Sequence, residues 1–137
     1  MQLQPYLFFN GRCEEAIQFY QRAVGAQVLM QMRYQDSPQP HAPGMVPAGW
    51  DAKIMHASLK IGESTVSVSD GSGCETTGFH GFALTLNTAD AAEADRTFAS
   101  LLDGGEVRMP LATTFFSSRF GMLVDRFGVL WMVIVSK

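Results

Sequence analysis

The sequence predicts an α+β fold made of two copies of one βαβββ module. Two segments roughly eighty residues apart, 5–29 and 81–107, follow the same plan: an apolar strand, an asparagine, a helical run and a strand that begins at glycine. In both halves, two further strand-like runs follow, separated by turn residues. Such a repeat indicates a fold that arose by duplication, with a groove where the two halves meet.

The first helix is predicted over residues 13–24. Its apolar residues recur at the spacing of one helical face, at Ala16, Phe19, Tyr20 and Ala23. Glu14 and Glu15 lie in the first turn, where the helix dipole favours acidic side chains, and Gly25 ends the helix. We therefore interpret this carboxylate pair as part of a solvated helix start, with a catalytic pair as the alternative.

The second helix is predicted to start near Asp90 and to run over residues 91–102. Its apolar side consists of Ala94, Phe98, Leu101 and Leu102. Gly104 and Gly105 end it. The equal length of the two helices supports the duplication.

Each module is predicted to contain a first strand before its helix and three strands after it. The three runs of the first half are 27–33, 53–61 and 64–69, and those of the second half are 106–111, 120–125 and 129–135. The whole chain, 1–137, is expected to form a single domain, with module 1 at about 1–70, a linker at about 71–78 and module 2 at about 79–137. The Pro-rich loop 36–51 is either a lid or dimer contact or a tolerated surface insertion.

Composition narrows the classes of function. The 137 residues are 47% hydrophobic, which is enough for a core, and the net charge of −3 without a basic cluster argues against nucleic-acid binding. No apolar run approaches the roughly 20 residues that a membrane span needs. The N-terminal residues resemble no export signal, so we expect a cytoplasmic protein. Cys13 and Cys74 are then expected to be reduced thiols rather than a disulfide.

Several short segments along nearly the whole chain match one known pattern: Pro5-Tyr6-Leu7, Glu15-Ala16-Ile17, Phe19-Tyr20, Lys53-Ile54-Met55-His56-Ala57, Ser69-Asp70, Thr114-Phe115-Phe116, the block 120–129, and Trp131-Met132-Val133. On these segments the chain resembles the vicinal oxygen chelate (VOC) superfamily, which includes glyoxalase I and bleomycin-resistance proteins, and within it the PhnB-like branch. The resemblance implies a cupped mixed sheet with helices outside. It also implies a homodimer.

The metalloenzymes of this superfamily hold their ion with four His or Glu side chains. Carried over by position, these ligands fall at about Pro5, Ser67 or Ser69, Gly81 and Met132. None of these side chains suits a divalent ion of the kind those enzymes use, so we expect no metal and no cofactor. A site rebuilt elsewhere would have to draw on His41, His56, Asp70, Glu75 or His80.

His56 is the best candidate for a catalytic residue. Strand alternation puts it with Ser58 on one face, and Ser67 and Ser69 of the neighbouring strand join them there. A histidine among serines is able to act as a base, a hydrogen-bond donor or a single metal ligand. The alternative is a structural histidine that orders the strand.

The rest of the predicted cup is mostly apolar. Its further candidate ligand-binding residues are Leu7, Phe9, Thr85, Arg119, Phe120, Met122 and Met132. A cup with one polar and one apolar side suits a small organic or aromatic ligand. The alternatives are an enzyme of unknown reaction that uses His56 or a recruited divalent metal, and a dimer whose cup is a relic. Related chains are often named as demethylubiquinone methyltransferases, but the Gly-rich stretch 70–78 lacks the spacing of a P-loop or dinucleotide fingerprint and is not followed directly by a helix, so nothing in the sequence supports methyl transfer.

Overall fold

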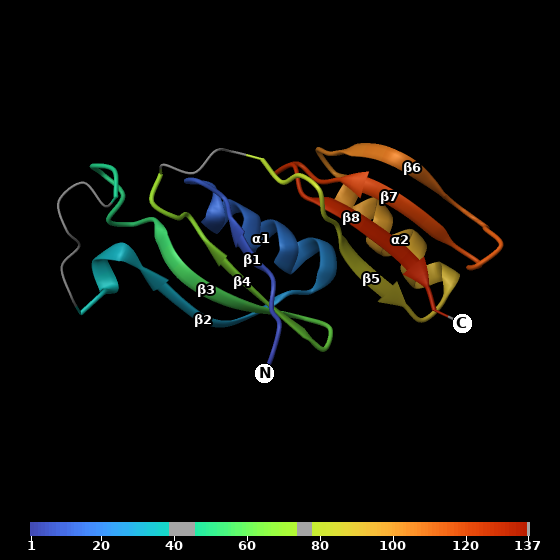
Figure 1. Cartoon of the computed structure of the whole chain (residues 1–137), viewed down its shortest axis with the longest axis horizontal. Helices are drawn as coiled ribbons and strands as arrows, with labels where there is room; N and C mark the ends of the chain where they lie inside the picture. The colour runs from blue at the N-terminus through green and yellow to red at the C-terminus, as the bar shows by residue number, and fades with distance from the viewer. Residues whose placement is uncertain (39–45, 74–77, 137) are drawn as a thin grey trace. The chain divides into compact units, whose positions relative to one another are not determined.

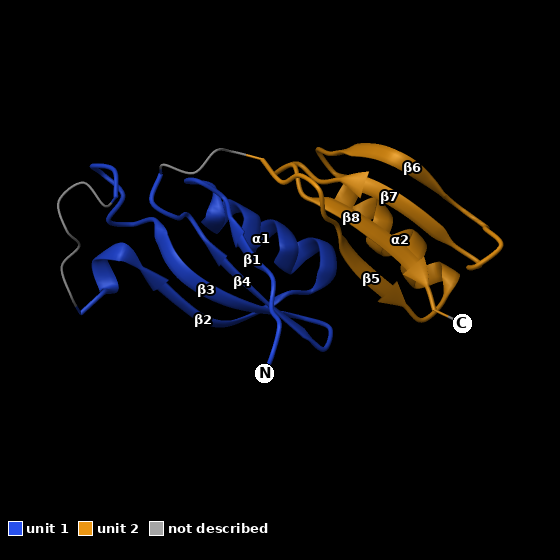
Figure 2. Cartoon of the chain, in the orientation of Figure 1, with its two compact units in different colours: residues 1–77 blue, residues 78–137 orange. Residues whose placement is uncertain are grey.

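The computed structural model describes residues 1–38, 46–73 and 78–136 (Figure 1). The chain divides into two compact units, Met1–Thr77 and Gly78–Lys137 (Figure 2). Each unit contains one four-stranded mixed sheet and one α-helix, which confirms the predicted α+β fold of two βαβββ modules. Parts of the Pro-rich loop (39–45) and of the linker (74–77), with His41, Cys74 and Glu75, lie outside the described residues.

Unit 1 follows the predicted element order closely. It comprises β1 (Tyr6–Phe8), α1 (Cys13–Val24), β2 (Gln27–Arg33), a short 3-10 turn (Tyr34–Asp36), β3 (Ile54–Ile61) and β4 (Ser64–Ser69). The strand order is β1-β4-β3-β2, in which β1 runs parallel to β4 and the other neighbours are antiparallel. The connection from β1 to β4 includes α1, and neighbouring parallel strands require a long crossover of this kind.

Helix α1 packs its apolar stripe against this sheet. Its buried residues are Cys13, Ala16, Ile17, Phe19 and Tyr20. Burial of each large apolar side chain stabilises the unit by about 1.5–3 kcal/mol. The helix ends where Gly25 adopts a left-handed conformation (φ 67°) and donates its N–H to the Tyr20 carbonyl, as the sequence predicted.

Unit 2 repeats this topology. It comprises β5 (Leu84–Thr88), α2 (Ala91–Leu102), β6 (Glu106–Ala112), β7 (Phe120–Val124) and β8 (Leu130–Val135), with strand order β5-β8-β7-β6. The Asp90 carboxylate caps α2 by accepting a 2.8 Å hydrogen bond from the Glu93 N–H. Ala94, Phe98 and Leu101 are buried on the helix side of the sheet.

The cross-strand registers of the two sheets are equivalent. Both second strands carry a register shift of the same kind, between Val28 and Met30 in β2 and between Val107 and Met109 in β6. One row of paired residues therefore crosses each sheet: Tyr6, Ser67, Ser58 and Met30 in unit 1, and Thr85, Met132, Met122 and Met109 in unit 2. We call the side of each sheet that carries this row the open face, because the helix packs on the other side.

A buried aspartate fixes the loops of each unit. Asp70 is fully buried and accepts hydrogen bonds from the N–H groups of Gly11, Cys13 and Ile54 at 2.7–2.9 Å. Asp125, which is 3% exposed, also accepts three hydrogen bonds, from the backbone N–H groups of Phe127 and Val129 and from the Trp131 indole N–H. Charge-assisted bonds of this kind offset the cost of burying a carboxylate.

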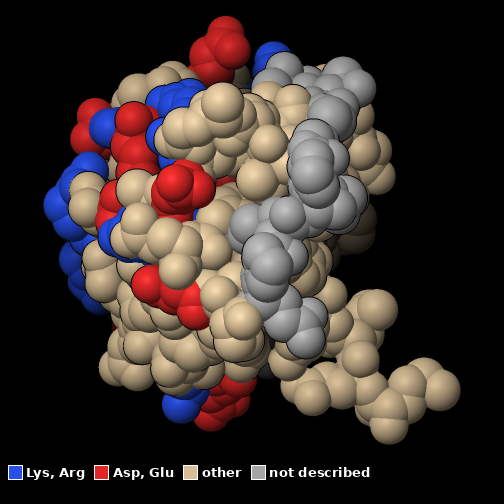
Figure 3. Space-filling view, turned by 90° about the vertical axis from the view of Figure 1, so that its left-hand side faces the viewer, with Lys and Arg blue, Asp and Glu red and all other residues tan. Residues whose placement is uncertain are grey.

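Surface charges are mixed in sign. Arg12 pairs with Glu15, and Arg33 pairs with Glu14. On the face drawn in Figure 3, basic and acidic side chains are interspersed rather than separated into large areas of one sign. None of the described helices combines the length and the apolar character that a membrane crossing requires.

Candidate functional site

The polar candidates of unit 1 lie together on its open face. In the antiparallel register, Ser58 pairs with Ser67 and Ala57 pairs with Val68. One residue further along each strand, His56 of β3 therefore lies beside Ser69 of β4. Ala57 and Val68 are fully buried against the helix side. The structure therefore places His56 and the three serines where strand alternation predicted, while their role in binding stays a prediction.

Leu7 and Phe9 do not lie on this face, and the expectation that they share it with His56 is wrong. Leu7 pairs with Val68, and both Leu7 (4% exposed) and Phe9 (6%) belong to the core under the helix. Tyr6 and Phe8 occupy the open face instead, because Tyr6 pairs with Ser67 and Phe8 with Ser69. The sequence analysis therefore missed Tyr6 as a side chain of the open face.

Tyr6 and His56 form a hydrogen-bonded pair. The phenol oxygen lies 3.0 Å from Nδ1 of His56, and the Tyr6 ring stacks on Phe8 with centroids 4.9 Å apart. Burial raises the pKa of the Tyr6 phenol above its usual value, and the nearby Ser69 hydroxyl partly offsets this rise. When the phenol donates to Nδ1, the proton of a neutral His56 ring resides on Nε2, which is then left as a hydrogen-bond donor.

The Ser69 hydroxyl, on the same face, is hydrogen-bonded to the backbone. It donates to the Met55 carbonyl at 2.7 Å and accepts from the Gly71 N–H at 2.9 Å. Since the hydroxyl proton is used by the backbone, Ser69 offers a ligand at most an acceptor. Ser58 and Ser67 also place hydroxyl groups on this face.

The open face of unit 2 is apolar where that of unit 1 is polar. Thr85, Met132 and Met122 lie side by side, with the Thr85 hydroxyl 3.8 Å from the Met132 sulfur. Phe120 pairs with Ile134 on the same face, and its ring meets Phe116 edge to face at 5.1 Å. These four predicted ligand-binding residues, Thr85, Phe120, Met122 and Met132, are brought together by the sheet.

Arg119 is not available on the open face. Its guanidinium forms an ion pair with Asp95 of α2, at 3.2 Å. Strand alternation explains this, because Arg119 precedes Phe120 and so points to the helix side. The expected role of Arg119 in holding an anion on the open face is therefore wrong.

The positions that hold a metal in related enzymes do not fit one here. The positions that the resemblance assigns to metal ligands are Pro5, Ser67 or Ser69, Gly81 and Met132, a set without His, Asp or Glu. Within the described parts of the chain, no three His, Cys, Asp or Glu side chains lie close enough to hold an ion. Asp70, one of the candidates for a rebuilt site, uses its carboxylate on three backbone N–H groups.

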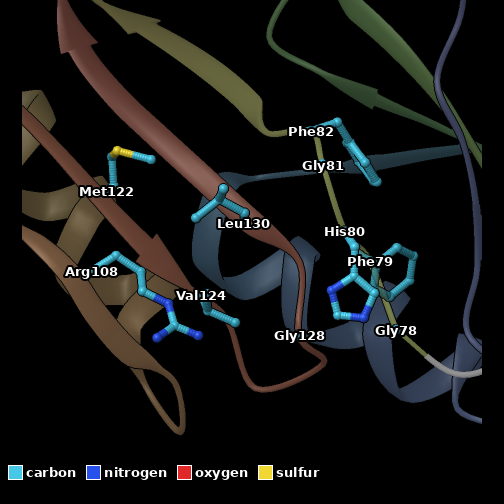
Figure 4. A pocket seen from close by; sticks show the side chains of 10 residues that line it. All are labelled: Gly78, Phe79, His80, Gly81, Phe82, Arg108, Met122, Val124, Gly128 and Leu130. Carbon is cyan, nitrogen blue, oxygen red and sulfur yellow. The ribbon is translucent and has the colours of Figure 1, made fainter.

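A pocket of about 470 Å³ opens on unit 2 (Figure 4). Ten residues line it: Gly78, Phe79, His80, Gly81, Phe82, Arg108, Met122, Val124, Gly128 and Leu130. Figure 4 shows the Arg108 guanidinium at one end and the His80 ring at the other, with Leu130 and Val124 between them. Of the predicted ligand-binding residues only Met122 reaches this pocket, and Arg108 was missed.

Comparison with known proteins assigns the family. Residues 1–134 match the model of the family described as 3-demethylubiquinone-9 3-methyltransferase. The chain belongs to this family. It is 34% identical over its full length to protein YjdN of Escherichia coli strain K12, covering 97% of that protein.

Solved structures support the same assignment. Protein PA1353 from Pseudomonas aeruginosa is 41% identical, with a TM-score of 0.86 over 99% of this chain and 98% of that one. A PhnB protein from Bacillus cereus is 25% identical, with a TM-score of 0.80 over 99% of this chain and 100% of that one. The fosfomycin resistance protein FosX from Mesorhizobium loti, 12% identical with a TM-score of 0.64 over 99% of this chain and 92% of that one, shares the fold alone. The PhnB-like branch of the glyoxalase-like VOC fold is thereby confirmed.

Proposed function

We propose that this member of the family is a cytoplasmic protein that binds a small organic molecule without a metal ion. The observation that carries the proposal is the pocket of unit 2. Its volume of about 470 Å³ falls within the range of about 300–1,000 Å³ that is typical of small-molecule sites. Apolar side chains form most of its wall, with two polar groups, Arg108 and His80, at its ends.

Metal-free binding is supported by the chemistry of the open faces. Of the positions that the resemblance assigns to metal ligands, Pro5 and Gly81 have no ligating side chain, and the serine hydroxyl and the Met132 thioether are poor ligands for the hard or borderline divalent ions. The apolar row of Thr85, Met122 and Met132 offers shape and dispersion contacts instead. An aromatic or aliphatic ligand body suits such a surface.

Methyl transfer, which the family's description names, is not part of the proposal. A methyltransferase needs a site for its methyl donor, and the Gly71-Ser72-Gly73 segment after β4 is followed, among the described elements, by strand β5 rather than by the helix of a nucleotide-binding loop. S-adenosylmethionine is therefore included in the binding test, where saturable binding would contradict this view.

One observation favours a second candidate function, an enzyme in which His56 takes part in proton transfer. The Tyr6–His56 hydrogen bond orients the imidazole, as second groups commonly do for catalytic histidines. Nothing on the open face of unit 1 identifies the reaction. Binding without chemistry remains the function that the site supports best.

The resemblance to VOC proteins also leads us to propose a homodimer. Light scattering coupled to size-exclusion chromatography tests this directly, since the 15.0 kDa chain would appear at twice its mass. A species at the mass of one chain over the micromolar range would reject the dimer and leave the binding proposal intact.

A thermal-shift screen tests the proposed function. We expect small aromatic and organic acids, amides and alcohols to include compounds that raise the melting temperature, because a ligand stabilises the folded state by mass action. Leu130→Trp fills the pocket and should abolish the shift. Gln18→Trp, which adds the same side chain to an exposed position of α1, is the matched control and should retain it.

Each hit is then measured by calorimetry on the wild type and both variants, with folding checked by circular dichroism. Binding that survives Leu130→Trp would place the ligand outside this pocket. If no compound binds the wild type, the proposed function is wrong.

A further inference from the structure

Arg108, like Arg22 and Arg96, takes no part in the four arginine ion pairs found among the described residues. These pairs are Arg12 with Glu15, Arg33 with Glu14, Arg119 with Asp95 and Arg126 with Asp103. Arg108 makes no hydrogen bond or ion pair within the part of the chain that the structure describes. Its guanidinium instead lines the pocket of unit 2 (Figure 4).

The duplication shows that the fold does not require this charge. Arg108 is the extra residue at the register shift of β6, between Val107 and Met109. The equivalent residue of β2 is Leu29, between Val28 and Met30, where the same register shift forms around an apolar side chain. An arginine at this position therefore serves something other than the strand geometry.

The pocket wall has the composition of a site for an anion with an apolar body. None of its ten lining residues is acidic, so nothing in the wall neutralises Arg108. Met122, Val124 and Leu130 supply apolar surface beside the guanidinium. His80, at the other end in Figure 4, adds a second nitrogen donor. Glu106, the acidic residue of β6, is exposed and does not line the pocket.

We propose that the pocket of unit 2 selects organic carboxylates, with the guanidinium of Arg108 as the group that recognises the anion. The inference rests on the proposed binding function and names its ligand class. The planar guanidinium donates two parallel N–H bonds to a carboxylate, a geometry that a lysine does not reproduce. Because Arg108 is exposed, this two-bond geometry rather than burial of the charge is what selects the carboxylate.

Benzoate and benzamide are the probes, because they share a ring and differ in charge. Binding is followed by NMR chemical-shift titration of the intact chain at pH 7. We expect the wild type to bind benzoate at least tenfold more tightly than benzamide. Arg108→Leu, the residue of the duplicate half, should abolish this preference and leave the affinity for benzamide unchanged.

Two controls keep the outcome specific. Arg96→Leu removes an equal charge from exposed α2 and should leave the preference for benzoate as in the wild type. Arg108→Lys keeps the charge and should recover only part of the preference. The wild-type comparison needs no variant, so misfolding of Arg108→Leu would not prevent the test.

The results separate this inference from the function on which it rests. Equal binding of benzoate and benzamide by the wild type would overturn the carboxylate inference and keep the binding function. A benzoate preference that persists in Arg108→Leu would overturn the role of Arg108. Absence of binding by both probes, with other compounds of the thermal-shift screen bound in the pocket, would reject the carboxylate class alone. Absence of any binding rejects both.

Discussion

The phenol of Tyr6 and the imidazole of His56, fifty positions apart in the chain, are joined by a hydrogen bond of 3.0 Å on the open face of unit 1. The bond exists because β1 and β3 flank β4, so that their side chains reach across it. It places the one exposed tyrosine of β1 next to the best candidate for a functional histidine.

Replacing Tyr6 with Phe should free the His56 ring without harming the fold. Removal of one partly exposed hydrogen bond costs about 0.5–1.5 kcal/mol at most. We expect the neutral imidazole of the wild type to populate one tautomer and that of Tyr6→Phe to populate both, as measured by nitrogen chemical shifts of the ring. His80, in the other unit, is the internal control, and an unchanged tautomer for His56 would contradict the pairing.

Replacing His56 with Ala separates a ligand contact from a structural role. His56 is half-buried, so we expect a loss in the free energy of unfolding below about 2 kcal/mol. Any screen hit that binds Leu130→Trp as well as the wild type, and so lies outside the pocket of unit 2, should bind at least tenfold more weakly per folded molecule. Lys60→Ala, at the exposed end of the same strand, is the control. A loss of several kcal/mol with unchanged affinity would show that His56 only orders β3.

Asp70→Asn should be among the most destabilising substitutions in unit 1. The carboxylate accepts three backbone hydrogen bonds, and an asparagine has one oxygen to offer and an NH₂ group that would face an N–H donor. We expect a loss of about 3 kcal/mol or more, measured by urea unfolding. Asp51→Asn, exposed at the surface, should change stability by less than about 0.5 kcal/mol. Equal effects of the two would contradict the structural role of Asp70.

The Glu14–Arg33 pair should contribute stability that disappears in acid. The hydrogen bond from Arg33 lowers the pKa of Glu14 below its ordinary value, so the folded state holds the ionised form more strongly than the unfolded state does. The contribution is therefore present above the ordinary glutamate pKa and is lost as the pH falls through the lowered value. Since the Glu14 side chain is half exposed, solvent limits it to less than about 1 kcal/mol.

Urea unfolding of the wild type and of Glu14→Gln at pH 7 and pH 2 measures this contribution. The two proteins should differ at pH 7 and agree at pH 2. Glu63→Gln, in the exposed β3–β4 turn, should match the wild type at both values. A Glu14→Gln difference that grows in acid would contradict the assigned direction.

The two helices could be predicted to the residue, because a strong apolar period ended at Gly25 in α1 and began after the capping Asp90 in α2. The face of β1 could not. Tyr6, Leu7, Phe8 and Phe9 are all large and apolar, so alternation gives no sign of which pair faces the helix, and only pairing with Ser67 decides it.

The candidate site was predicted in part for a similar reason. His56 and Ser58 alternate with a buried alanine and leucine, and Ser67 and Ser69 alternate with two buried valines, which fixed their face. Arg108 has no such signal within its own strand, because a register shift at that position breaks the alternation. Alignment of the two halves, which sets Arg108 against Leu29, is the comparison that would have found it.

The three hydrogen bonds accepted by the Asp70 carboxylate connect the start of α1, the start of β3 and the end of β4 through one side chain. Local unfolding of any one of these segments would remove a hydrogen-bond donor from the buried Asp70 carboxylate. We therefore expect the three segments to unfold together. In deuterated solvent, the amides of Cys13 and Ile54 should accordingly exchange at one common, slow rate despite their distance in the chain. The N-terminal half would then behave as a single cooperative block in which local fraying is suppressed.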